Sequence, residues 1–148
     1  SGNRICALPD ALTGWGGLKT LNLADNGLLI LPPVDRLGRL TLLDLSSNDL
    51  RQIPDELAGM EALTELRLPG NALTRVPESL WHLPALATVD LSDNQLCELS
   101  WAMRTAPVLR SLNVSGNPLP AAPMLRWMLR RRLGDGLQIT GDTEDQGV

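Results

Sequence analysis

The sequence predicts an α/β solenoid of stacked parallel strands, and three observations support this fold class. Asparagine recurs at positions 26, 48, 71, 94 and 117, with spacings of 22, 23, 23 and 23 residues. A short apolar alternation precedes each asparagine, as in LKTLNLADN and LTELRLPGN. A second apolar run follows it, as in NGLLILP and NALTRVP. A fixed period of this length indicates a repeat fold, in which each unit packs on its neighbours.

Each repeat contains a strand followed by a bend. The alternating stretch can form one strand whose leucines point to a single face. Residues such as Leu21, Leu23 and Leu28 become buried only when units stack. The recurrent asparagine suits a tight bend after the strand, where its amide can bond backbone groups that lack a ladder partner. We therefore expect the asparagines to be structural rather than to contact a ligand.

Short helices or 3₁₀ turns are expected on the other side of each coil. The segments PDALTGW, PDELAGM and PESLWHL begin with proline and an acidic residue, which favour a helix start. Trp15 takes the place of Met60 and Leu83, so we expect it in the core. The positions expected to point inward from these segments are Leu12, Leu57, Leu80 and Met103.

The motif LxxLxLxxNxLxxLP resembles the leucine-rich repeat family over nearly the whole chain. Five strand units and a leading half-unit at Asn3 carry the match. The 23-residue period with LP after the strand is similar to intracellular repeats of signalling scaffolds and of some bacterial effectors. The resemblance implies a curved solenoid, with parallel strands on the concave face and short helices or 3₁₀ turns on the convex face.

Three segments are expected. Residues 1–123 hold the repeats, residues 124–134 form a C-terminal capping helix, and residues 135–148 form a polar, partly disordered tail. The chain begins inside a repeat, so we expect a longer array or a larger protein. The unit that starts at Asn26 lacks one residue between Pro32 and Leu37. Its convex segment should therefore be shorter and less helical than the others.

Charge, hydropathy and cysteine positions limit the partners and the compartment. A net charge of −4 and a pI of about 4.9 argue against nucleic-acid binding. The sequence contains no apolar run of the roughly 18 residues that a membrane helix needs. Cys6 and Cys97 lie four repeats apart, about 19 Å in a strand stack, so both should be free thiols. Cysteine-rich caps are absent as well, so we expect an intracellular, cytoplasmic location, or a host cytoplasm if the chain is a bacterial effector.

The sequence contains no recognisable catalytic or metal-binding constellation. His82 is the only histidine and is expected at the surface, so a two-histidine metal site is impossible. Cys97 has no predicted neighbouring base. We therefore expect no enzymatic activity, no cofactor and no metal.

Stacked strands should align their outward side chains into columns on the concave face. Arg67 is the sole cation in the column shared with Asp44 and Asp90, and Pro69 follows it at the end of the strand. This unit is the least generic of the array, so it is the predicted centre of a partner footprint. Trp81 and Trp127, on the convex side, are a second candidate surface. The predicted partner-binding residues are Leu42, Asp44, Glu65, Arg67, Thr88, Asp90 and Asp93.

The leading functional hypothesis is a non-catalytic protein–protein interaction module that binds a protein with a basic or polar surface through the concave face. One alternative is the substrate-recognition segment of a larger enzyme, such as a bacterial effector ubiquitin ligase or a repeat-bearing kinase. Another alternative is a structural spacer without its own partner.

Overall fold

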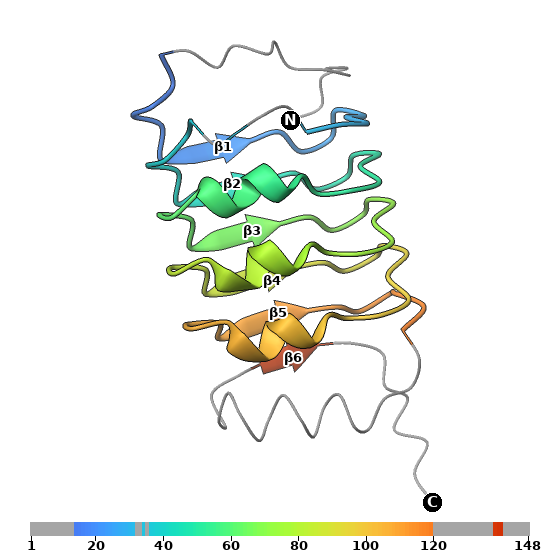
Figure 1. Ribbon diagram of the computed structural model, residues 1–148. Helices are drawn as coiled ribbons and strands as arrows, with labels where there is room; N and C mark the ends of the chain where they lie inside the picture. The colour runs from blue at the N-terminus through green and yellow to red at the C-terminus, as the bar shows by residue number, and fades with distance from the viewer. Residues whose placement is uncertain (1–13, 32–33, 35, 120–137, 141–148) are drawn as a thin grey trace, which may run out of the picture.

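The chain forms a stack of coils whose strands make one parallel sheet (Figure 1). The computed structural model describes residues 14–31, 34, 36–119 and 138–140. Its six strands pair in the order of the sequence, each parallel to the next. The strands are β1 Thr20–Asn22, β2 Leu42–Asp44, β3 Glu65–Arg67, β4 Thr88–Asp90, β5 Ser111–Asn113 and β6 Gln138–Thr140. This arrangement confirms the predicted α/β solenoid.

Strand β6 lies within the segment predicted as a polar tail. The sequence predicts a polar tail from residue 135, whereas residues 138–140 pair in parallel with β5, with Leu112 opposite Ile139. The segment LQIT carries the alternation that a strand needs, but no repeat asparagine follows it. The predicted capping helix at 124–134, and the tail residues 135–137 and 141–148, lie outside the described residues.

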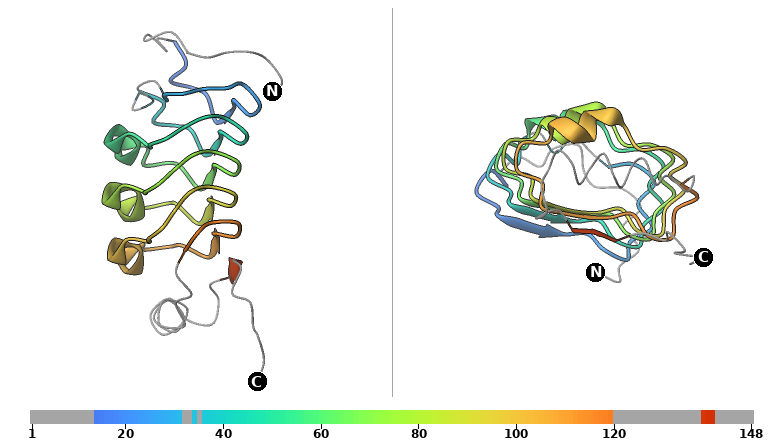
Figure 2. Two further views of the ribbon diagram at one scale, coloured as in Figure 1. Left: turned by 90° about the vertical axis from the view of Figure 1, so that its right-hand side faces the viewer. Right: turned by 90° about the horizontal axis from the view of Figure 1, so that it is seen from below.

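In the described part of the chain, three short 3₁₀ helices lie across the coil from the sheet (Figure 2). The buried side chains of the strands and of these helices form one core cluster. The helices are η1 Asp55–Gly59, η2 Glu78–His82 and η3 Trp101–Thr105. Pro54 and Pro77 directly precede η1 and η2, as the sequence predicts. Before η3 the same place is taken by Ser100, whose Oγ accepts a hydrogen bond from the N–H of Ala102 at 3.1 Å.

The convex segment of the 22-residue unit agrees with its prediction. Its described residues from Arg36 to Arg39 form turns, whereas the next three units carry 3₁₀ helices. Residues 32, 33 and 35 of this segment lie outside the described residues.

The core is a continuous column of leucines from successive coils. Leu43, Leu66 and Leu112 of the strands are fully buried, and burying one such side chain contributes about 1.5–3 kcal/mol. From the helices, Leu57, Leu80 and Met103 point inward as predicted. The predicted inward position Leu12 lies outside the described residues.

Two tryptophans lie in environments opposite to the predicted ones. Trp15 is predicted in the core, but it is 40% exposed. Its counterparts Met60 and Leu83 are enclosed between stacked coils, whereas Trp15 belongs to the first described coil, next to turns at residues 14 and 16. Trp81 is predicted at the surface, but it is 1% exposed and packs in the core. Trp127 lies outside the described residues.

The repeat asparagines form a hydrogen-bonded ladder that joins each coil to the preceding one. Asn48 Oδ1 accepts from the N–H of Leu28 at 2.9 Å, and its Nδ2 donates to the carbonyl of Leu23 at 3.0 Å. The same Nδ2 donates to Leu45 in its own coil at 2.9 Å. The residues that repeat this pattern are Asn71, Asn94 and Asn117. The predicted structural role of the asparagines is therefore confirmed.

Candidate functional site

The register of the sheet produces the columns that the sequence predicts. Leu42 pairs with Thr20 and Glu65, and Glu65 pairs with Thr88. In the second column, Arg67 lies between Asp44 and Asp90 on the adjacent strands. We call the outward surface of β1 to β5 the strand face; it corresponds to the predicted concave face.

The second column fixes the ends of most strands. The side-chain oxygens of Asn22, Asp44, Asp90 and Asn113 each accept from the N–H two residues later, at 3.0–3.2 Å. In three of these coils the later residue is a serine, whose hydroxyl donates to the same oxygen. These Asx-type turns satisfy a backbone group where the ladder ends.

The third coil lacks this turn because both residues that form it elsewhere are replaced. Arg67 has no acceptor atom, and Pro69, two residues later, has no N–H to donate. The two departures from the repeat therefore compensate each other. The carbonyl of Pro69 still accepts from the N–H of Ser47 at 2.8 Å, so the coil keeps its contact with the preceding one.

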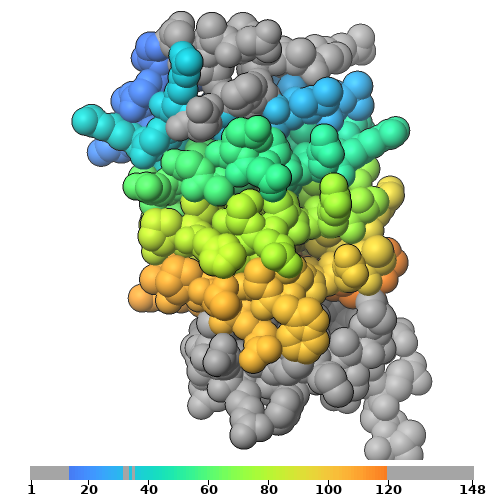
Figure 3. Space-filling model, viewed as in Figure 1, coloured from blue at the N-terminus to red at the C-terminus, as the bar shows by residue number. Residues whose placement is uncertain are grey.

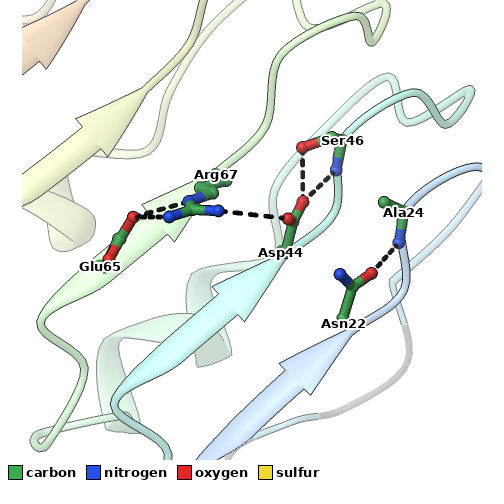
Figure 4. A network of polar contacts seen from close by, with 6 residues as sticks. All are labelled: Asn22, Ala24, Asp44, Ser46, Glu65 and Arg67. Atoms are coloured by element: carbon green, nitrogen blue, oxygen red, sulfur yellow. Dashed lines mark hydrogen bonds and ion pairs between the residues drawn. The ribbon is translucent and has the colours of Figure 1, made fainter. Parts of the chain in front are cut away.

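The guanidinium of Arg67 is held by carboxylates on its own strand and on β2 (Figure 4). Its Nε donates to Glu65 Oε1 at 2.6 Å, and its Nη2 lies 2.6 Å from the same oxygen. Nη1 lies 3.8 Å from Asp44 Oδ2. Although Arg67 lies between two aspartates in its column, its closest contact is Glu65, which lies two residues earlier on the same face of the strand. The side chain of Arg67 remains 46% exposed.

The predicted site residues differ in accessibility. Asp44 is predicted to face a partner, but it is only 8% exposed. Ser46 and Arg67 contact its carboxylate from two sides, which explains this reduced exposure. Of the other predicted residues, the exposed ones are Arg67 and Asp93, and the half-buried ones are Leu42, Glu65, Thr88 and Asp90.

Asp93 belongs to a column that is shaped by backbone conformation. The residue before each repeat asparagine has a positive φ, between 52° and 66° in the coils that contain β1 to β5. The residues at this position are Asp25, Ser47, Gly70, Asp93 and Gly116. Short polar residues and glycine tolerate this left-handed region best, so the column reflects a requirement of the bend.

The other groups singled out by sequence form no reactive cluster within the described ranges. His82 is exposed, as predicted, and its Nε2 lies 3.4 Å from Thr105 Oγ1. Cys97 is a free, exposed thiol, as predicted, and Cys6 lies outside the described residues. Among residues 14–31, 34, 36–119 and 138–140, no group of three potential metal ligands comes together. No helix in this part of the chain is long and apolar enough to span a membrane.

Trp101 is an exposed residue that the sequence prediction did not single out. It begins η3 and is 61% exposed. In the repeat it occupies the position of Asp55 and Glu78, which are also exposed. That alignment with two acidic residues is the signal that could have placed it at the surface.

Comparison with known proteins agrees with the coil geometry. Residues 38–96 match the family model described as leucine rich repeat. A solved leucine-rich repeat protein of Leptospira interrogans has a similar fold, with a TM-score of 0.60 and 26% sequence identity. The match covers 82% of this chain and 36% of that protein, so this chain spans about a third of its length. No curated protein matches the sequence. Residues 38–96 therefore match the leucine-rich repeat family, and the asparagine ladder and the parallel strand stack continue the same coil pattern on both sides of that range.

Proposed function

We propose that this domain is a non-catalytic protein-interaction module that binds a protein partner through its strand face. Leucine-rich repeat domains generally serve protein–protein interaction, and solenoids offer extended surfaces for it. The net charge of −4 favours a protein partner with a basic or polar surface over a nucleic acid.

The observation that carries the proposal is the paired change at Arg67 and Pro69. In the other four described coils, the second-column residue bonds the backbone that follows it. Pro69 removes the need for that bond, so position 67 can hold an exposed guanidinium, which Glu65 orients. Arginine is enriched among residues that dominate binding energy at interfaces.

The proposed footprint surrounds Arg67 in the middle of the strand face. Glu65 and Arg67 form its centre, and the half-buried Leu42 adds apolar area on β2. The neighbouring polar residues of the footprint are Asp44, Thr88, Asp90 and Asp93.

A binding titration with a matched control tests the footprint. A partner captured by affinity purification is titrated against wild type and the triple variant Glu65→Gln/Arg67→Gln/Asp90→Asn. We expect the triple variant to bind at least about tenfold more weakly, because an arginine anchor alone can contribute more than about 1 kcal/mol.

The matched control removes the same charges at exposed residues away from the columns. It is the triple variant Arg36→Gln/Asp49→Asn/Glu61→Gln, and it should bind the partner as wild type does. Unchanged affinity in the footprint variant, or an equal loss in the control, contradicts the proposal.

We also propose a reducing compartment, the cytoplasm of the producing cell or of a host. The free, exposed thiol of Cys97 suits such an environment. Fractionation of the producing cells and of exposed host cells tests this location, and recovery of the tagged protein only from the oxidising extracellular medium contradicts it. In a longer protein, the same strand face could select substrates for a catalytic domain.

A further inference from the structure

A pocket of about 780 Å³ opens on the surface beside the 3₁₀ helices, on the side of the coil away from the strand face. Equivalent positions of three consecutive coils line it: residues 52–56, 75–78 and 98–101. These are the segments that lead into η1, η2 and η3. Figure 3 shows the face of the molecule that carries these helices.

The lining of the pocket has an apolar floor and an acidic rim. Ile53 is buried, and Val76 and Leu99 are half-buried at the matching position of the next two coils. Among the described residues of the lining, Arg75 is the only cation. The acidic residues, all exposed, are Asp55, Glu56, Glu78 and Glu98. The pocket therefore has a surplus of negative charge around a strip of apolar surface.

Hydrogen bonds between coils hold two of these carboxylates. The Oγ of Ser100 donates to Glu78 Oε1 at 3.1 Å, from the next coil. The Oγ of Ser79 lies 3.4 Å from Asp55 Oδ1, also one coil away. Each carboxylate retains capacity for another donor, because a carboxylate has about four lone-pair sites.

An exposed indole lines the part of the pocket nearest η3. Trp101 is 61% exposed, while Met103 on the same helix is buried and supplies the contact with the core. The guanidinium carbon of Arg104 lies 5.5 Å from the centroid of the indole ring, which favours one orientation of the ring. Exposed tryptophans are frequent anchors for binding partners, and their faces attract cations.

We propose that this pocket binds an extended, arginine-bearing segment of a partner protein. Negative charge on the rim complements guanidinium groups, Trp101 offers a ring on which a guanidinium or apolar side chain can stack, and the floor accommodates the peptide backbone. Three coils at about 4.8 Å per strand spacing span roughly 10 Å, the length of about three extended residues. The site is separate from the strand face, and the proposal does not depend on binding there.

The probe is the fluorophore-labelled heptapeptide GRARARG, with a second peptide in which citrulline replaces each arginine. Anisotropy titrations use the full chain at low ionic strength. We expect saturable binding of the arginine peptide and binding at least about tenfold weaker of the neutral one. Trp101→Ala should weaken binding about threefold, as expected for one exposed cation–π contact.

Charge variants locate the binding site. Glu78→Gln/Glu98→Gln should weaken binding about threefold to tenfold, as expected for the loss of two surface ion pairs. Arg75→Ala should strengthen binding about twofold to threefold, a gain that unfolding cannot mimic. Glu61→Gln, an exposed acid outside the pocket, and Asp90→Asn on the strand face should leave binding unchanged. Urea unfolding of each variant verifies that it is folded.

Three outcomes would overturn the proposal. The first is the absence of saturable binding. The second is an equal loss of binding with Glu61→Gln, which indicates general attraction of the peptide to an acidic protein. The third is a loss of binding with Asp90→Asn but not with the pocket variants, which assigns the peptide to the strand face. None of these outcomes bears on whether another partner binds around Arg67.

Discussion

Asn48 accepts a hydrogen bond from the backbone N–H of Leu28, twenty residues earlier in the chain, at 2.9 Å. Both residues are buried, so the bond crosses from one coil to the next where water cannot replace it. The amides of four repeat asparagines contribute to stability by joining two coils: Asn48, Asn71, Asn94 and Asn117.

Removal of one of these amides should destabilise the whole stack. Asn71→Ala leaves the N–H of Leu50 without its acceptor, whereas the carbonyl of Leu45 keeps Asn48 as a donor. We expect a loss of about 1–3 kcal/mol in unfolding free energy, the cost of one orphaned buried group. Urea denaturation measures the loss. As a control, Gln95→Ala at an exposed site should change stability by less than about 0.5 kcal/mol, and an equal effect of both changes would contradict the role of the ladder.

The paired change at Arg67 and Pro69 predicts that substitutions at these two positions have non-additive effects on the free energy of unfolding. Arg67→Asn alone places an acceptor opposite a proline that has no N–H, and Pro69→Ser alone adds an N–H opposite an arginine. The double variant restores the turn seen at Asn113 and Ser115. We expect a favourable coupling of about 0.5–1.5 kcal/mol in the double-mutant cycle, measured by urea unfolding. Strict additivity of the two single effects would argue against compensation between these residues.

Two tryptophans should respond differently to truncation. Trp81→Ala removes a fully buried side chain and should cost about 3–5 kcal/mol. Trp101→Ala removes an exposed one and should cost less than about 1 kcal/mol, its contact with Arg104 included. Thermal or urea unfolding distinguishes the two. Similar losses at both positions would be incompatible with the opposite burial of the two indoles.

Glycines at equivalent bends should tolerate alanine unequally. Gly70 and Gly116 both have φ of 66°, so alanine at either costs about 1–2 kcal/mol. At Gly70 a Cβ meets Ser47 Oγ at an ordinary 3.6 Å, whereas at Gly116 it collides with the Asp93 carboxylate and lies 3.2 Å from the Asp93 nitrogen. Gly116→Ala should therefore be the more destabilising change. In an Asp93→Gly background, the difference in stability loss between Gly70→Ala and Gly116→Ala should shrink. Calorimetry measures these losses.

The repeat made most of this fold predictable. Spacing alone aligned Leu42 with Glu65 and Thr88, because strands of equal period stack in register. Burial at the sides of the coil was harder to predict. Trp81 and Trp15 fall at regular positions, yet their exposure depends on how η2 turns and on which coils enclose them.

Contacts within the candidate site were predictable only in part. The sequence placed Arg67 outside the core and in the correct column, but it did not indicate that Glu65 would be its closest partner. That choice depends on side-chain reach along a single strand rather than on the period. The relation between Arg67 and Pro69 became visible only once the neighbouring Asx-type turns were seen as hydrogen bonds.

The asparagine ladder also determines how the molecule would carry mechanical load. Each rung joins only adjacent coils, from Asn48 to Asn117, so tension along the solenoid axis passes through the rungs in series. In a series arrangement every junction carries the same force, and extension proceeds by the rupture of one junction at a time. We therefore expect such a stack to yield coil by coil under load, because each coil contacts only its neighbours.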